Sequence, residues 1–164
     1  MTGYKSYPLV VDELLVRQAR KTLSDRYERT FAFLKPEIIS RRLVGEVLRI
    51  IENKGFRIIH FEPQFATAEK VLNHYAQHQA KPFFKDLVWS LVGNMVVPMV
   101  LEAPNAVVHL INLVGPYQVD GHVPGTLRAM FALTDRENGI HRADSLEAAK
   151  REINIWFPDQ QLPS

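Results

Sequence analysis

Residues 95–101 read MVVPMVL, seven consecutive apolar residues, and this run constrains the fold more than any other part of the chain. The run suits a buried strand and is too short to cross a membrane, which needs about 20 apolar residues. A second run, residues 29–34 (RTFAFL), combines aromatic and small apolar side chains in the way typical of a strand. Lys35 and Pro36 end it, because proline cannot continue a central ladder. We expect both runs to be buried strands.

Helical and strand patterns alternate around these two runs. Helices are expected at 40–54, from Thr67 through Tyr75, at 81–91, at 104–113 and from Asp144 onward, where Asp144 and Glu147 resemble a capping box. A further strand is expected at 56–65, a loop at 114–124, and a short fourth strand after residues 125–133. This order predicts an α+β fold, a ferredoxin-like split βαβ unit. It would have a four-stranded antiparallel sheet with helices on one face.

Composition narrows the class of protein. The chain has 164 residues, 46% hydrophobic and 23% charged, which fits one globular domain. Its net charge of +2 lies in residues 1–27, whereas residues 28–164 are balanced, so nucleic acid is an unlikely partner. The absence of cysteine excludes disulfides and a thiolate nucleophile and is compatible with a cytoplasmic location. Residues 1–27 have a helical pattern after Pro8, and acidic residues precede any signal-peptide-like apolar stretch.

Histidines are the candidates for chemistry, because the chain has neither a P-loop nor a G-x-G-x-x-G motif. His74 and His78 are four residues apart and could share a metal, although the sequence offers no third ligand nearby. His141 has the most informative surroundings, because it precedes a capped helix, where an anion can be held. Imidazole can act as a nucleophile and carry a phosphoryl group. A loop histidine without a function is the alternative.

Several motifs resemble those of nucleoside diphosphate kinases, in the same order and over residues 28–157. They are RTFAFLKP at 29–36, LVGE at 43–46, KGFR at 54–57, His74-Tyr75, PFF at 82–84, PGTLR at 124–128 and NGIHRADS at 138–145. The last is similar to the active-site signature N-x-I-H-[GA]-S-D-S. The chain thus resembles a divergent member of this family, with an N-terminal extension at 1–27 and a short tail at 158–164.

The resemblance implies a ping-pong reaction through a phosphohistidine. A nucleoside triphosphate would phosphorylate His141, and a nucleoside diphosphate would then take the group. The implied roles are nucleophile for His141, orientation of the imidazole for Glu152, contact with the transferring phosphoryl and the ribose for Lys35, support of Lys35 for Tyr75, base stacking for Phe83 and Leu87, phosphate binding for Arg128 and sugar binding for Asn138. Mg²⁺ would be held by the nucleotide phosphates, and Asp144 could reach it through water. The family also implies a homo-oligomer, a dimer-based tetramer or hexamer.

Several positions depart from the family pattern, among them Arg142 and Ala143 in the active-site signature, the loop at 116–123, and two phosphate-binding positions. Counting back from the PGTLR motif, Ile111 stands where the family has a phosphate-binding arginine, and Tyr117 stands where it has a phosphate-binding threonine. A charged hydrogen bond contributes about 1.5–3 kcal/mol, so phosphate binding should be weaker. The alternative function is therefore a weak or inactive kinase-like domain that binds a nucleotide or a protein partner. Tyr117, Arg142 or His122 could compensate by donating to the phosphates. A ferredoxin-like module that binds RNA is disfavoured by the neutral domain.

Overall fold

The computed structural model describes residues 12–14 and 27–158, so most of the expected N-terminal helix lies outside the described residues. The strands are β1 (Tyr27–Leu34), β2 (Arg57–Phe61), β3 (Gln64–Phe65), β4 (Met95–Pro104) and β5 (Ile140–Arg142). The helices are α2 (Pro36–Ser40), α3 (Val44–Asn53), α4 (Ala68–His74), α5 (Phe84–Leu91), α6 (Ala106–Val114), α7 (Leu127–Phe131) and α8 (Leu146–Trp156), with 3₁₀ turns η1 (Ala76–His78) and η2 (Val119–Gly121). None of the helices in the described part of the chain is long and apolar enough to cross a membrane.

The two apolar runs form the buried strands β1 and β4, as the sequence predicts, and these two strands lie at the centre of the sheet. The strand order is β2-β4-β1-β5, with β3 also paired to β4, and every pairing is antiparallel. Thr30 pairs with Leu101 and Phe33 with Pro98, so β1 and β4 run alongside each other for eight residues. Glu102 of β4 forms ion pairs with Arg29 of β1 and Arg57 of β2, at 3.1 and 2.9 Å, on the strands that flank it. The antiparallel sheet with packed helices is confirmed.

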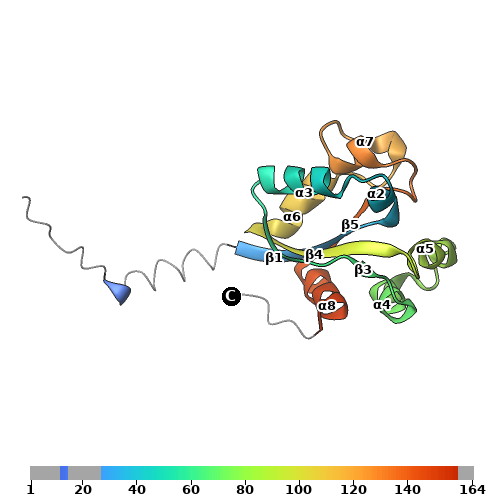
Figure 1. Cartoon of the computed structure of the whole chain (residues 1–164), viewed down its shortest axis with the longest axis horizontal. Helices are drawn as coiled ribbons and strands as arrows, with labels where there is room; N and C mark the ends of the chain where they lie inside the picture. The colour runs from blue at the N-terminus through green and yellow to red at the C-terminus, as the bar shows by residue number, and fades with distance from the viewer. Residues whose placement is uncertain (1–11, 15–26, 159–164) are drawn as a thin grey trace, which may run out of the picture.

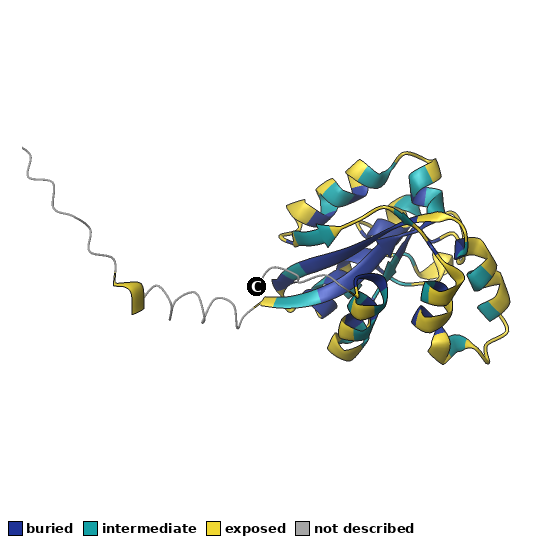
Figure 2. Cartoon of the chain, turned by 60° about the horizontal axis from the view of Figure 1, so that its bottom comes forward, coloured by how far each residue is buried: buried dark blue, intermediate teal, exposed yellow. Residues whose placement is uncertain are grey.

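Helices cover both faces of the sheet, so the expectation of helices on one face is wrong. In Figure 1, α3 and α6 lie above the strands, and α4 and α8 lie below them. The alternation of β1 explains why: Ala32 and Leu34 enter one buried cluster, while Phe31 and Phe33 enter another. Figure 2 shows the strands as the most buried part of the molecule. Because β1 is apolar at every position from Phe31 to Leu34, both of its faces need a cover.

The remaining differences from the sequence predictions are local. The strand expected at 56–65 divides at Pro63, which has no N–H to donate, into β2 and the short strand β3, so the sheet has five strands instead of the expected four. Residues 125–133 hold helix α7 instead of leading directly into a strand, because Thr126 caps a helix by accepting from the Ala129 N–H at 3.3 Å. The cap of α8 is Ser145, one residue after the expected Asp144, and its hydroxyl accepts from the Ala148 N–H at 3.0 Å.

Candidate active site

A cavity of about 440 Å³ opens where α4, α5, β5 and the loop before α7 meet. Its lining residues are Lys35, Tyr75, His78, Phe83, Asp86, Leu87, Ser90, Tyr117, Arg128, Arg136, Asn138, Ile140 and His141. The volume lies in the usual range for small-molecule sites. Seven of the residues implied by the resemblance line this one cavity. Glu152 lies directly behind it, and Asp144 is exposed and outside the lining.

His141 lies in the middle of β5, directly across from Phe33 of β1. The two rings stack with their centroids 4.8 Å apart and their planes 21° apart. Gly139 brings the chain into β5 with a φ of 78°, a left-handed conformation that favours glycine. A Cβ at Gly139 would also lie 3.0 Å from the Ile38 side chain. The backbone therefore holds the imidazole against a rigid central strand.

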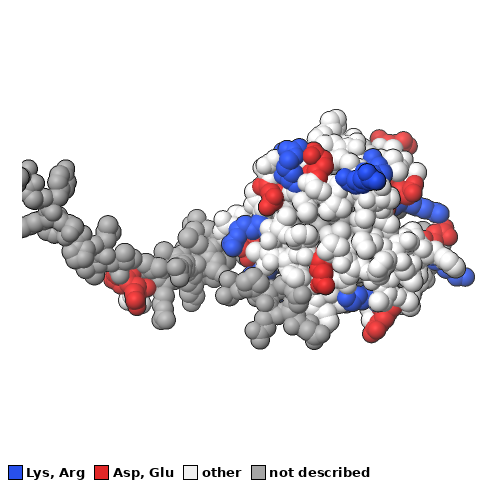
Figure 3. All heavy atoms as spheres, in the orientation of Figure 1, with Lys and Arg blue, Asp and Glu red and all other residues white. Residues whose placement is uncertain are grey.

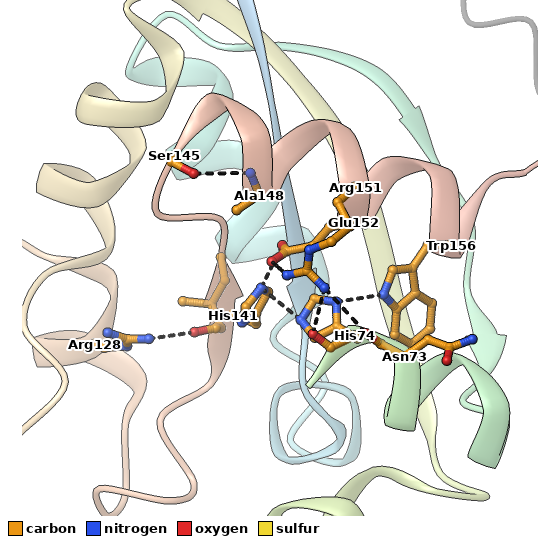
Figure 4. Close-up of polar contacts among 10 residues, drawn as sticks. Asn73, His74, Arg128, His141, Ser145, Ala148, Arg151, Glu152 and Trp156 are labelled. Atoms are coloured by element: carbon orange, nitrogen blue, oxygen red, sulfur yellow. Dashed lines mark hydrogen bonds and ion pairs between the residues drawn. The ribbon is translucent and has the colours of Figure 1, made fainter. Parts of the chain in front are cut away.

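Glu152 of α8 holds the imidazole from behind. Its carboxyl Oε2 lies 2.9 Å from Nε2 of His141, as Figure 4 shows. The hydrogen bonds of His141 to other described side chains all use Nε2. Nδ1 is thus the ring nitrogen left for an electrophile in the cavity. When Nε2 carries the ring proton and donates it to Glu152, Nδ1 has the lone pair that a nucleophile needs.

The protonation states of both residues suit this role. Burial lowers the pKa of His141 well below its usual value, and the cations Lys35, Arg128, Arg142 and Arg151 lower it further. The imidazole is therefore neutral at pH 7. Burial raises the pKa of Glu152 to about 6, so its carboxyl is mostly ionised at neutral pH and can still accept a proton.

Two buried cations stand beside the imidazole. Lys35, at the end of β1, donates from Nζ to the backbone oxygen of Arg136 at 2.9 Å. Burial lowers its pKa to about 8. Arg128 of α7 donates to the backbone oxygens of Gly115 and Ile140 at 3.1 and 3.0 Å. These bonds hold both side chains in place, so positive charge is fixed where an anion would approach.

The other implied residues lie farther along the cavity. Phe83 exposes 42% of its surface, which is unusual for phenylalanine and leaves a ring face free for stacking. Leu87 lies one turn along α5 and also faces the cavity. Tyr75 is buried, and burial raises the pKa of its hydroxyl, so the hydroxyl stays neutral. Asn138 donates to the Asp135 carbonyl at 2.7 Å, while its amide oxygen is buried without a partner. That oxygen is available to a ligand hydroxyl.

Sequence reasoning named His74 only as a metal candidate and within a motif, and it missed Asp86 and Arg136. His74 lies 3.0 Å from His141, between their Nε2 atoms. Asp86 and Arg136 form a 2.9 Å ion pair between α5 and the loop before β5, and both line the cavity. The spacing of His74 could not reveal its partner, because the partner is 67 residues away on another element. Asp86 and Arg136 had no signal beyond being charged.

The possible compensations for the departures separate in the structure. Tyr117 lines the cavity, with the Arg128 guanidinium 5.8 Å from its ring centroid. Arg142 and His122 are not among the lining residues. Side chains alternate along a strand, so Arg142 projects to the opposite face of β5 from His141. Of the three, Tyr117 is therefore the one that lines the cavity, beside Arg128.

A metal between His74 and His78 does not fit this geometry. α4 ends at His74, so the two residues do not share a helix face, and the group of possible ligands is instead His74, His141 and Glu152. The indole N–H of Trp156 donates to Nδ1 of His74 at 3.1 Å. Neutral His74 then carries its proton on Nε2, the atom a metal would need. The three side chains therefore form a hydrogen-bonded cluster, for which a metal is not required.

The surface charge agrees with the sequence. On the face drawn in Figure 3, blue and red side chains are mixed, and no broad basic area appears. The positive charge placed to bind an anion lies inside the cavity, on Lys35 and Arg128, which are both 7% exposed.

Comparison with known proteins agrees with this site. Residues 28–162 match the family described as nucleoside diphosphate kinase. The chain is 42% identical over 135 residues to the nucleoside diphosphate kinase of Moorella thermoacetica, covering 82% of this chain and 97% of that one. It is equally identical over 135 residues to the enzyme of Thermus thermophilus, covering 82% and 98%.

Solved structures lead to the same family. The nucleoside diphosphate kinase of Aquifex aeolicus superposes with a TM-score of 0.79 at 30% identity, covering 84% of this chain and 99% of that one. A nucleoside diphosphate kinase family protein from Babesia bovis gives a TM-score of 0.79 at 36% identity, covering 84% and 93%. With the matched residues spanning every element of the sheet and the whole cavity, the chain belongs to the nucleoside diphosphate kinase family.

Proposed function

We propose that this chain carries out nucleoside diphosphate kinase chemistry through His141. A nucleoside triphosphate gives its terminal phosphoryl group to Nδ1, and a second nucleoside diphosphate removes it. The observation that carries the proposal is the pairing of His141 Nε2 with Glu152 at 2.9 Å, beneath a cavity with two fixed cations. This arrangement leaves Nδ1 as the ring nitrogen available to a phosphate that enters the cavity.

The transfer needs little besides positioning and charge. The lone pair of Nδ1 attacks the terminal phosphorus, an N–P bond forms, and the P–O bond to the rest of the nucleotide breaks. The leaving oxygen keeps the electron pair and carries negative charge on the nucleoside diphosphate. Lys35 and Arg128 offset the charge on the transferring group, and the hydroxyl of Tyr117 adds a donor from the loop.

The two ends of the cavity fix the direction of the nucleotide. Because the phosphates must reach His141, Lys35 and Arg128, the base is placed at the end that holds Phe83 and Leu87. Stacking on an aromatic ring suits any base, so this end would not select strongly among nucleotides. The unpartnered amide oxygen of Asn138 would accept from a sugar hydroxyl between the two ends.

Magnesium fits as an ion that arrives with the nucleotide. Asp86 is the one carboxylate in the lining given for this cavity, and it is paired with Arg136. The described residues thus supply no set of protein carboxylates there, and the phosphates would hold the ion, with Asp144 near enough only for contact through water. When bound, the ion neutralises phosphate charge.

The alternative of a nucleotide-binding domain without transfer is not favoured, because the nucleophile and its carboxylate are in place. Ile111 stands at the position of the family's phosphate-binding arginine, so one cation of the family pattern is missing. Tyr117 stands at the position of the family's threonine and keeps a hydroxyl there, in the cavity lining. We further propose a cytoplasmic homo-oligomer built from dimers, on the strength of the family relationship. The extension at residues 1–27 is proposed to serve assembly.

Labelled ATP tests the proposal directly. Incubation with γ-labelled ATP and Mg²⁺ should give a phosphoprotein that is acid-labile and base-stable, and GDP should discharge it. His141→Ala should abolish the label. His109→Ala is the matched control, since His109 lies on α6 against Phe56, away from the cavity, and it should label normally. Label that persists in His141→Ala would place the phosphoryl group elsewhere and overturn the proposal.

A further inference from the structure

His74 lies behind the nucleophile, on the side away from the cavity. It is the last residue of α4 and is 1% exposed. Its ring is tilted 76° to that of His141, with the centroids 4.3 Å apart and the two Nε2 atoms 3.0 Å apart. Figure 4 shows His74 between His141 and Trp156. His74 is absent from the cavity lining, so it can act on the reaction only through His141.

Trp156 determines which nitrogen of His74 carries the proton. An indole nitrogen is a donor only, and Trp156 donates to Nδ1 of His74 at 3.1 Å. Nδ1 must then hold a lone pair. Burial lowers the pKa of His74 well below its usual value, so the ring is neutral and its single proton lies on Nε2. His74 therefore directs an N–H at Nε2 of His141.

A hydrogen bond between the two Nε2 atoms requires a proton on one nitrogen and a lone pair on the other. The attacking form of His141 has its proton on Nε2 and directed at Glu152, so in that form the His74 N–H finds no lone pair on Nε2 to bond to. After phosphorylation Nδ1 carries the phosphorus, and the ring becomes neutral when Nε2 gives up its proton. Nε2 then has a lone pair that matches the His74 donor.

Glu152 is placed to take that proton. Its Oε2 is 2.9 Å from His141 Nε2, and its other oxygen is 3.4 Å from the Arg151 guanidinium. Arg151 also donates to the His74 backbone oxygen at 3.1 Å, which fixes the end of α4 against α8. The cluster thus has a proton acceptor and a proton donor aimed at the same ring nitrogen.

We propose that His74 is a positioning residue that stabilises phosphorylated His141 by donating its Nε2 proton to Nε2 of that ring. The inference rests on the proposed function. As the N–P bond forms and the leaving oxygen departs with its electron pair, the Nε2 proton of His141 moves to Glu152. The His74 N–H then bonds to the vacated lone pair. An interaction made in the phosphorylated intermediate and not in the attacking form favours phosphorylation.

Two variants of the full chain separate this role from packing against Trp156. His74→Asn keeps an acceptor near the position of Nδ1 and loses the Nε2 donor, whereas His74→Gln keeps a donor near the position of Nε2 and loses the Trp156 acceptor. The measured quantity is the equilibrium constant for enzyme plus ATP going to phosphoenzyme plus ADP. It should fall about tenfold in His74→Asn and change less than about twofold in His74→Gln, as expected for one net hydrogen bond.

A spectroscopic measurement supplies the second readout. In the wild-type phosphoenzyme, the ¹⁵N shift of His141 Nε2 should report a lone pair, and in His74→Asn it should move toward the protonated value. Equal equilibrium constants in the two variants, or a protonated Nε2 in the wild type, would overturn the inference alone. Failure of wild-type His141 to take up phosphate would overturn the proposed function and the inference with it.

Discussion

Lys35 carries a charge in this site that depends on pH near neutrality. Its amino group is buried at the end of β1, and burial lowers its pKa to about 8, so the group loses its charge as pH rises through that value. Glu152 works in the opposite sense: its pKa is raised to about 6, and it loses its negative charge as pH falls through that value. The site therefore has its active charge state between the two.

The rate should follow this window. We expect kcat/KM for a nucleoside triphosphate to be greatest between about pH 6 and pH 8 and to fall on both sides, because this parameter reports the free enzyme. In Lys35→Arg the alkaline fall should disappear, since guanidinium stays charged. The Lys35→Arg profile, measured by a coupled assay, would contradict the assignment if it kept the same alkaline limb.

Stability should respond in the opposite direction at Lys35. A buried amine with a lowered pKa favours the neutral form, so the charged form destabilises the fold. This penalty is fully present below the folded pKa of about 8 and is relieved as pH rises from there toward the unfolded value of 10.5. Function and stability thus make opposite demands on one residue, as is common at active sites.

At the residue level the sequence predicted which residues gather at the cavity better than it predicted their contacts. His141, Lys35 and Arg128 were identified because their motifs are contiguous in sequence. His74 was recognised only as part of a motif, since its bond to His141 depends on how α4 packs beside β5. His74 and His78 were a candidate metal pair without a third ligand in the sequence, and because α4 ends at His74, their spacing of four residues does not place them on a shared helix face.

At the level of elements, an ion pair links the two walls of the cavity. Asp86 on α5 and Arg136 before β5 approach to 2.9 Å, with 55% and 69% of their side chains exposed. Exposed pairs contribute about 0–1 kcal/mol to stability, so this pair does not hold the fold together. Its position in the lining means that an incoming nucleotide meets one negative and one positive charge.

Removing either charge should change nucleotide binding in opposite directions. Asp86→Asn should lower the KM for ATP and Arg136→Gln should raise it, each by roughly twofold to fivefold, because the nucleotide is an anion and exposed charges act weakly. Steady-state kinetics at low salt measure both. Arg49→Gln, on the exposed face of α3 beside Glu46, is the control and should leave KM unchanged. A change of the same sign in both cavity variants would contradict the prediction.

The elements themselves were predictable where local chemistry decided them. The apolar runs predicted β1 and β4, and Thr67 predicted the start of α4, where its hydroxyl accepts from the backbone N–H of Lys70. The faces were not predictable in the same way. A strand that is buried on both faces differs in sequence from a strand that is buried on one face at every second residue and nowhere else. The ferredoxin-like pattern favoured a single layer of helices.

For the whole molecule, the fold should not depend on a metal. The described residues place no cluster of carboxylates in the cavity, and the buried histidine cluster is complete without an ion. EDTA should therefore leave the Tm of the nucleotide-free protein unchanged, while it abolishes phosphoryl transfer and removes the extra stability that bound ATP provides. Differential scanning calorimetry with and without EDTA tests this. A lower Tm without nucleotide would show that protein side chains hold an ion.

The bond between Trp156 and His74 has one more consequence, and it is optical. Of the two tryptophans in the chain, Trp89 is 83% exposed and Trp156 is 2% exposed. The buried indole touches the histidine that touches the nucleophile, so its fluorescence is coupled to the proton arrangement of the site. With Trp89→Phe removing the exposed indole, Trp156 would be the single tryptophan, separated from the phosphoryl group by His74 and His141, and its emission would follow each half of the catalytic cycle.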